Sequence, residues 1–206
     1  MTGTASGRID GRTARGERTR RAIVDALLEL IGEGDLKASP ERIVERAGVS
    51  LRTLWTNFKD LEGLYAAVND RLIEIIDEHH RPVSPDLPLE SRVRLFCEQR
   101  GRILEMAAPA ARAAALRLPF SAQLRQNQAV HNARIQAEIE AVFAAELAAT
   151  RDGSLLRALV VNTTWPAWSV LRDELGLDAV AATDVMTWTV GALLACKGTL
   201  PSPGTV

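Results

Sequence analysis

Cysteine is nearly absent from this chain of 206 residues, and the two that occur, Cys97 and Cys196, stand far apart. Neither belongs to a Cys-x-x-Cys pair or has a histidine at metal-ligand spacing, so neither a disulfide nor a zinc site is indicated. The sequence also lacks an apolar run long enough to span a membrane. We therefore expect a cytoplasmic protein in a reducing compartment, with no cofactor, no metal and no membrane partner.

Net charge is nearly absent as well. The 25 basic and 26 acidic residues give a formal charge of −1, so no global field marks the chain as a nucleic-acid binder. Any affinity for DNA must therefore come from local patches of charge. Lysine occurs only at Lys37, Lys59 and Lys197, and the resulting bias toward arginine runs through the whole chain.

Residues 1–16 lack the apolar core of a signal peptide and consist mostly of glycine, threonine, serine and arginine. This composition predicts a disordered basic arm. The arginines of the arm and of the segment after it are Arg8, Arg12, Arg15, Arg18, Arg20 and Arg21. They indicate either phosphate or minor-groove contacts or a solvated tail, and both interpretations stay open at this point.

Residues 39–58 carry the most informative pattern, two short helical segments joined by a tight turn. Ser39 and Ser50 are candidate N-caps, because a serine hydroxyl can accept from an unpaired amide of the first turn. Gly48 can take a positive φ, which lets the chain turn sharply. Val49 is apolar within the turn and is expected to pack between the two helices. Together these features favour a helix-turn-helix.

The second of these segments divides into two faces at the helical spacing of 100° per residue. The apolar face consists of Leu51, Leu54, Trp55 and Phe58, and the outward face consists of Arg52, Thr53, Thr56 and Asn57. The outward face offers hydrogen-bonding groups without a carboxylate, which suits DNA, and a helix of this width fits the major groove. An amphipathic helix with a solvated polar face would have the same pattern, and the preceding turn favours the DNA-binding interpretation.

The segment resembles the DNA-binding region of the TetR family of transcriptional regulators. The matching residues are Gly34, Ser39, Ile43, Ala47, Gly48, Val49, Ser50, Thr53, Leu54, Phe58 and Leu64. This resemblance covers roughly the first third of the chain, and beyond it only the helical layout and the length agree.

Four positions depart from the family pattern. Ala38 and Ser39 stand where the family often has two threonines. Trp55 replaces a tyrosine whose hydroxyl commonly reaches a DNA phosphate, leaving only an indole N–H donor. Leu61 stands where a lysine is usual, with Lys59 nearby. The candidate DNA-binding residues are Ser39, Ser50, Arg52, Thr53, Trp55, Thr56, Asn57 and Lys59.

Apolar spacing predicts an all-α fold throughout. The domains expected are a disordered arm over 1–16, a three-helix helix-turn-helix lobe over 17–65, a larger helical lobe over 66–200 and a disordered tail over 201–206. The first helix is predicted over 17–33, and the later ones over 89–107, 109–118, 122–149, 154–174 and 178–197. Pro166 is expected to kink the helix over 154–174.

The family resemblance implies a homodimer that binds a palindromic DNA operator as a repressor and is released by a small, largely apolar effector. The residues expected to line the effector cavity are Phe96, Met106, Leu116, Phe120, His131 and Trp165. Those expected at the dimer interface are Trp168, Leu171, Trp188, Gly191 and Ala195, where tryptophans occur among small residues.

No catalytic motif is found in the sequence. It lacks a glycine-rich phosphate loop, a G-x-S-x-G elbow and an H-E-x-x-H zinc motif. We therefore do not expect an enzyme. The alternative is a helical small-molecule-binding protein or enzyme whose helix-turn-helix lobe serves only as a scaffold.

Overall fold

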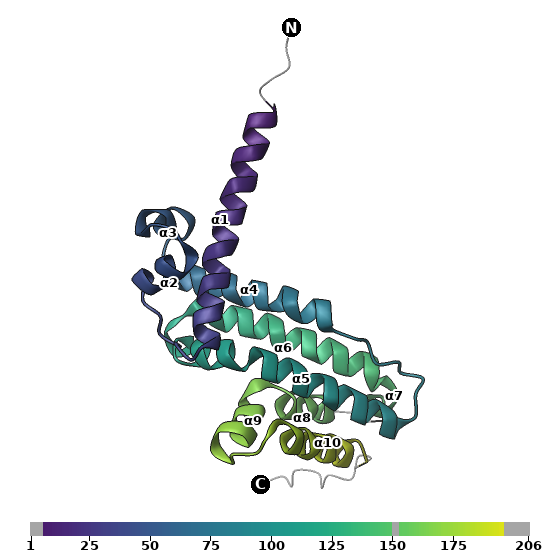
Figure 1. Ribbon diagram of the computed structural model, residues 1–206. Helices are drawn as coiled ribbons and strands as arrows, with labels where there is room; N and C mark the ends of the chain where they lie inside the picture. The colour runs from purple at the N-terminus through teal and green to yellow at the C-terminus, as the bar shows by residue number, and fades with distance from the viewer. Residues whose placement is uncertain (1–5, 150–152, 196–206) are drawn as a thin grey trace, which may run out of the picture. The chain divides into compact units, whose positions relative to one another are not determined.

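A computed structural model describes residues 6–149 and 153–195, and it contains helices and loops without a strand in those ranges (Figure 1). The helices are α1 (Ser6–Gly32), α2 (Pro40–Ala47), α3 (Leu51–Asn57), α4 (Leu61–His79), α5 (Leu89–Ala115), the 3-10 turn η1 (Leu118–Phe120), α6 (Ala122–Val142), α7 (Ala144–Leu147), α8 (Ser154–Asn162), α9 (Trp165–Ser169), the π-helical turn η2 (Val170–Glu174) and α10 (Ala179–Ala195). The prediction of an all-α fold is confirmed.

The chain forms two compact units. The first unit comprises the residues up to Glu78 together with Pro109–Asn127, and the second comprises His79–Ala108 and the chain from Gln128 onward. The first unit is therefore larger than the predicted lobe over 17–65, because it also contains α4 up to Glu78, the end of α5, η1 and the start of α6. None of the helices in the described residues is long and apolar enough to cross a membrane.

The helix-turn-helix lies in the first unit, and its local geometry is as predicted. The hydroxyl of Ser39 accepts from the amide of Arg42, and the hydroxyl of Ser50 accepts from the amide of Thr53 at 3.1 Å. Gly48 ends α2 in the left-handed region, at φ 65° and ψ 34°, a conformation that a residue with a Cβ adopts only with strain. The turn therefore depends on glycine at this position.

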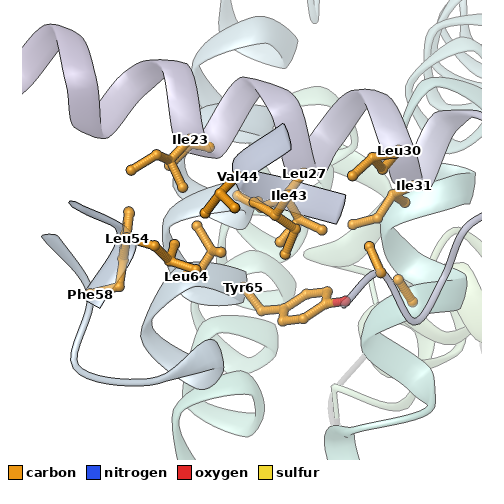
Figure 2. Packing of buried hydrophobic residues seen from close by; sticks show 14 of the residues in the cluster. Ile23, Leu27, Leu30, Ile31, Ile43, Val44, Leu54, Phe58, Leu64 and Tyr65 are labelled. Atoms are coloured by element: carbon orange, nitrogen blue, oxygen red, sulfur yellow. The ribbon is translucent and has the colours of Figure 1, made fainter. Parts of the chain in front are cut away.

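The core of the first unit brings together one apolar face from each of its first four helices. Figure 2 shows these side chains meeting, from α1 (Ile23, Leu27, Leu30, Ile31), α2 (Ile43, Val44), α3 and the residue that caps it (Leu54, Phe58) and α4 (Leu64, Tyr65). Val49 of the turn packs against this cluster, as expected. Ala113 and Leu124, from the segment that returns to this unit, are also part of the core.

The predicted apolar face of α3 is narrower than the sequence pattern indicated. Leu54 is fully buried and Phe58 is 4 % exposed, but Leu51 and Trp55 are 39 % and 43 % exposed. The expectation that Leu51 packs inside the lobe was therefore wrong, and Trp55, which its spacing placed on the same apolar face but which was also predicted to bind DNA, is exposed as well. Leu51 lies in the first turn and Trp55 at the margin of the stripe, so α3 itself buries Leu54, and its capping residue Phe58 supplies the second core side chain. Figure 2 shows Leu54 and Phe58 in the core.

The first helix begins at Ser6 instead of Glu17, so most of the segment predicted as a disordered arm is helical. Residues 1–5 lie outside the described residues, as does the predicted tail over 201–206. Once the buried part of α1 has formed, each further residue adds one backbone hydrogen bond without a new nucleation cost. Three arginines favour this extension and no proline stops it, whereas Gly7, Gly11 and Gly16 oppose it.

Two prolines, Pro109 and Pro166, do not have the effects on the helices that the sequence predicted. Pro109 lies inside α5 and does not separate two helices, although the boundary between the units falls at this residue. The small alanines on both sides keep the helical propensity high enough to tolerate one missing amide. Pro166, expected to kink a helix, instead lies in the first turn of α9, where its missing N–H costs nothing. The predicted helix over 154–174 is thus broken after Asn162.

The predicted helix over 122–149 is also interrupted, at Phe143. This side chain is fully buried and meets the ring of Phe96 edge-on at 5.4 Å between centroids. The guanidinium of Arg92 donates a hydrogen bond to the carbonyl of Val142 at 2.8 Å and pairs with both carboxylate oxygens of Glu146. These contacts form the core of the second unit at the point where α6 ends and α7 begins.

A matched pair of substitutions tests the division of α3 into a buried and an exposed face. Leu54→Ala should lower the free energy of unfolding by about 2–5 kcal/mol, because truncating a fully buried leucine leaves a cavity. Leu51→Ala, on the same helix, should lower it by less than about 1 kcal/mol, because that side chain is already partly in water. Chemical denaturation followed by circular dichroism measures both values, and equal losses would contradict the assignment of the faces.

Candidate DNA-binding surface

The solvent-facing side of α3 is the candidate DNA-binding surface. Arg52 and Thr56 are exposed on it, Thr53 is half-buried, and Lys59 is exposed just beyond the helix. The helix itself contains no acidic residue. The surface therefore presents cationic and neutral hydrogen-bonding groups without a carboxylate to repel phosphates.

Hydrogen bonds within the motif occupy part of this polar surface. The hydroxyl of Thr56 donates to the carbonyl of Arg52 at 2.7 Å, and the hydroxyls of Ser50 and Thr53 are 2.9 Å apart. The side-chain amide of Asn57 donates to the carbonyl of Thr53 at 2.8 Å. Asn57 is half-buried and folded back on its own helix, so it is less outward than the sequence indicated. Of the four residues predicted on the outward face, Arg52 is the exposed one whose side chain takes part in none of these bonds.

The margins of the surface contain the other predicted DNA-binding residues. Ser39 and Ser50 are exposed, but their hydroxyls already cap α2 and α3. Trp55 is 43 % exposed, so its indole N–H lies on a side chain that reaches solvent. Lys59 adds a flexible positive charge at the other end of α3. The roles of these residues toward DNA stay predictions.

The helix preceding the turn is held to α1 by an exposed ion pair. Two nitrogens of Arg46 donate to the two oxygens of Glu33 at 2.8 Å each, and this hydrogen bonding lowers the pKa of Glu33 and raises that of Arg46. Because Arg46 is engaged in this way, its charge is directed toward α1. This leaves Arg52 and Lys59 as the basic groups on the candidate surface.

Sequence reasoning missed the segment that returns to the first unit at 109–127. Arg117 donates to the carbonyl of Leu36 at 3.0 Å, and its guanidinium lies 3.9 Å from the centre of the Tyr65 ring. The hydroxyl of Ser121 donates to Glu62 at 2.5 Å. These partners are far apart in the sequence, so no local pattern predicts them. They hold the loop before α2 and the start of α4.

The residues predicted to line an effector cavity fall in both units. In the second unit, Phe96 is buried, and Met106, His131 and Trp165 are half-buried. In the first unit, Leu116 is 45 % exposed and Phe120 is 87 % exposed. A shared apolar cavity for these six side chains stays a prediction.

The second unit also has polar groups in its interior. Arg100 is 2 % exposed, and two of its nitrogens donate to the carbonyl of Thr163, where α8 ends. Burial, together with the charges of Arg100 and Arg134 acting in the same direction, lowers the pKa of His131 to about 4. His131 is therefore neutral at pH 7, and Arg100 supplies the positive charge beside it.

The residues predicted at a dimer interface divide into buried and exposed ones. Trp168 is 1 % exposed, and its indole N–H donates to Glu105 at 2.8 Å, so its side chain packs in the core and offers almost no surface to a partner. Leu171 and Gly191 are half-buried, whereas Ala195 is exposed. Trp188 is 75 % exposed on α10. Other large apolar side chains exposed on this part of the chain are Val161, Val170, Leu175, Val180 and Val185.

Comparison with known proteins gives structural likeness only. No family model and no curated protein sequence matches the chain. The multidrug binding protein EbrR, solved with imidazole, aligns with a TM-score of 0.61 and 21 % identity over 92 % of this chain and 93 % of its own. A protein from Mesorhizobium loti assigned to the TetR family of transcriptional regulators aligns with a TM-score of 0.66 and 18 % identity, over 90 % of this chain and 99 % of its own. A transcriptional regulator from Rhodococcus sp. Rha1 aligns with a TM-score of 0.59 and 17 % identity, over 90 % of this chain and 99 % of its own.

These alignments extend over both units, whereas the resemblance in the sequence covered only the helix-turn-helix region. At such low identity they establish the fold and leave the individual site residues untested. The chain has the all-helical fold of the TetR-family transcriptional regulators.

Proposed function

We propose that this protein is a homodimeric, DNA-binding transcriptional regulator of the cytoplasm that acts as a repressor and is released from its operator by a small-molecule effector. The observation that carries the proposal is the exposed, carboxylate-free face of α3, displayed on a helix that two buried side chains anchor. A reading helix needs this combination, because its outer face must be free while its inner face is fixed.

Arg52 would read bases and Lys59 would hold the backbone. Arg52 is exposed near the start of α3, the part of a recognition helix that reaches base edges in the major groove. Its guanidinium can donate two hydrogen bonds to guanine, whereas Lys59 lies past the helix end and carries a point charge suited to phosphate. Ser50, Thr53 and Thr56 would add contacts to bases or phosphates.

A dimer would place two such helices on one operator. Binding a palindromic site requires the two reading helices to lie about one helical turn of DNA apart, roughly 34–36 Å. The exposed apolar residues of α8 and α10, among them Trp188, which is 75 % exposed, supply a surface that a second copy of the chain would cover. An interface of this kind is isologous, since the same patch is used by both copies.

An effector would act by shifting the spacing of the two reading helices. A small molecule that binds better to a dimer with another spacing lowers the population able to bind the operator. The likeness to EbrR, a multidrug binding protein solved with imidazole, supports a small-molecule ligand for this chain. The second unit offers Phe96 and Trp165 as apolar groups and His131 as a neutral polar one.

Affinities on matched duplexes test the two roles on the reading helix. The operator is first defined by selecting duplexes from a random library with the wild-type protein. Arg52→Ala should then lose about 1–3 kcal/mol on the selected duplex and much less on a scrambled one. Lys59→Ala should weaken both alike and lower the salt slope by about one unit per subunit. If Arg52→Ala lost the same affinity on both duplexes, α3 would not be the reader.

The dimer proposal is tested at the most exposed tryptophan. Trp188→Arg should raise the dimer dissociation constant at least about ten-fold, because it places a charge in the apolar patch, while leaving the monomer fold intact. Trp188→Phe is the matched control and should remain dimeric. Sedimentation equilibrium measures the association of each variant, with circular dichroism to check the fold. An intact dimer of Trp188→Arg would place the interface elsewhere.

A further inference from the structure

Arg20 of α1 makes two contacts with the end of the reading helix. One of its terminal nitrogens donates to the carbonyl of Asn57 at 2.8 Å. Its guanidinium carbon lies 4.2 Å from the centre of the Phe58 ring. Asn57 is the last residue of α3 and Phe58 is the residue that caps it, so both contacts fall at the C-terminal end of this helix.

These contacts match what the end of a helix lacks. The final carbonyls of a helix have no intrahelical partner, and the helix dipole places partial negative charge there. The amide of Phe58 already donates to Leu54, and Arg20 satisfies the carbonyl of Asn57 from outside the helix. The guanidinium also covers the Phe58 ring, whose other surroundings are the core of the first unit.

The neighbouring arginines of α1 are placed differently. Arg21 is exposed and pairs with Glu74 of α4 at 3.4 Å. Arg15 and Arg18 are exposed, whereas Arg20 is half-buried. The group of arginines for which the sequence left open DNA contacts or a solvated tail therefore contains one member directed at α3 itself.

We infer that Arg20 is a positioning residue: it fixes the C-terminal end of α3 and thereby sets the sequence specificity of DNA binding, without itself reading a base. This inference rests on the proposed function, since specificity has meaning only if α3 reads DNA. The physical reason is that base contacts depend on the orientation of the helix, whereas phosphate contacts tolerate small shifts. Loosening one end of α3 therefore removes discrimination before it removes non-specific affinity.

The test compares Arg20→Lys, Arg20→Ala and Arg18→Ala in the full-length chain. Lysine keeps the charge but lacks the planar guanidinium, which can stack on the Phe58 ring and donate to the carbonyl of Asn57 at the same time. Both Arg20 variants should lower the ratio of affinities for the selected and scrambled duplexes by about ten-fold. The salt slope of Arg20→Lys should equal that of wild type. Arg18→Ala removes the same charge from an exposed position and should leave the ratio unchanged.

A direct phosphate contact would give the opposite pattern. In that case Arg20→Lys would bind both duplexes like wild type, and Arg20→Ala would weaken both equally with a smaller salt slope. This result would overturn the inference and leave the proposed function standing. If the wild-type protein enriched no sequence from the random library, the proposed function would fail instead.

A second readout does not depend on DNA. Amide hydrogen exchange of Arg20→Lys should be about ten-fold faster over residues 51–58, because the end of α3 opens more easily, and unchanged over residues 23–31 of α1. Circular dichroism confirms that the variant is folded. Unchanged exchange over residues 51–58 would show that Arg20 does not hold the helix, and would overturn the inference whatever the outcome with DNA.

Discussion

A helix of seven residues cannot sustain itself in water, and this constraint governs the candidate DNA-binding surface. Within α3, Leu54 supplies a fully buried anchor, and Phe58, which caps the helix, supplies a second one. Ser50 satisfies an amide at its start, and Arg20 satisfies a carbonyl at its end. With both ends and the inner face fixed from outside, the outer face remains free to bind. The shortness of the helix thus separates anchoring residues from binding residues.

The same constraint explains why the first unit is larger than a bare helix-turn-helix. Three short or amphipathic helices bury little apolar surface, so the unit takes further core residues from α4 and from the segment over 109–127. Arg117 and Ser121 of that segment hold the loop before α2 and the start of α4 through Leu36 and Glu62. The segment includes the end of α5 and the start of α6, and the rest of these two helices belongs to the second unit. Each of the two helices therefore contributes residues to both units.

The fold and the helix-turn-helix could be predicted from the sequence because their signals are local. Ser39, Gly48 and Ser50 act within one turn of the chain, so spacing alone places them. The exposure of Leu51 and the bond of Arg20 to α3 could not be predicted, because they depend on which helices pack around α3. Periodicity gives the direction of a side chain around its helix but not the width of the surface that covers it. The extent of the first unit escaped prediction for the same reason, since its partners are distant in sequence.

The central claim is that α3 reads base edges, and a change of specificity tests it most directly. Selection from a random duplex library would be repeated with Arg52→Gln, with Lys59→Gln as the control. Arginine favours guanine and glutamine favours adenine in the major groove, so the selected sequence should change at one position in each half-site and stay constant elsewhere. Lys59→Gln should select the wild-type sequence. If Arg52→Gln also selected the unchanged wild-type sequence, the account of α3 as the reading helix would be contradicted.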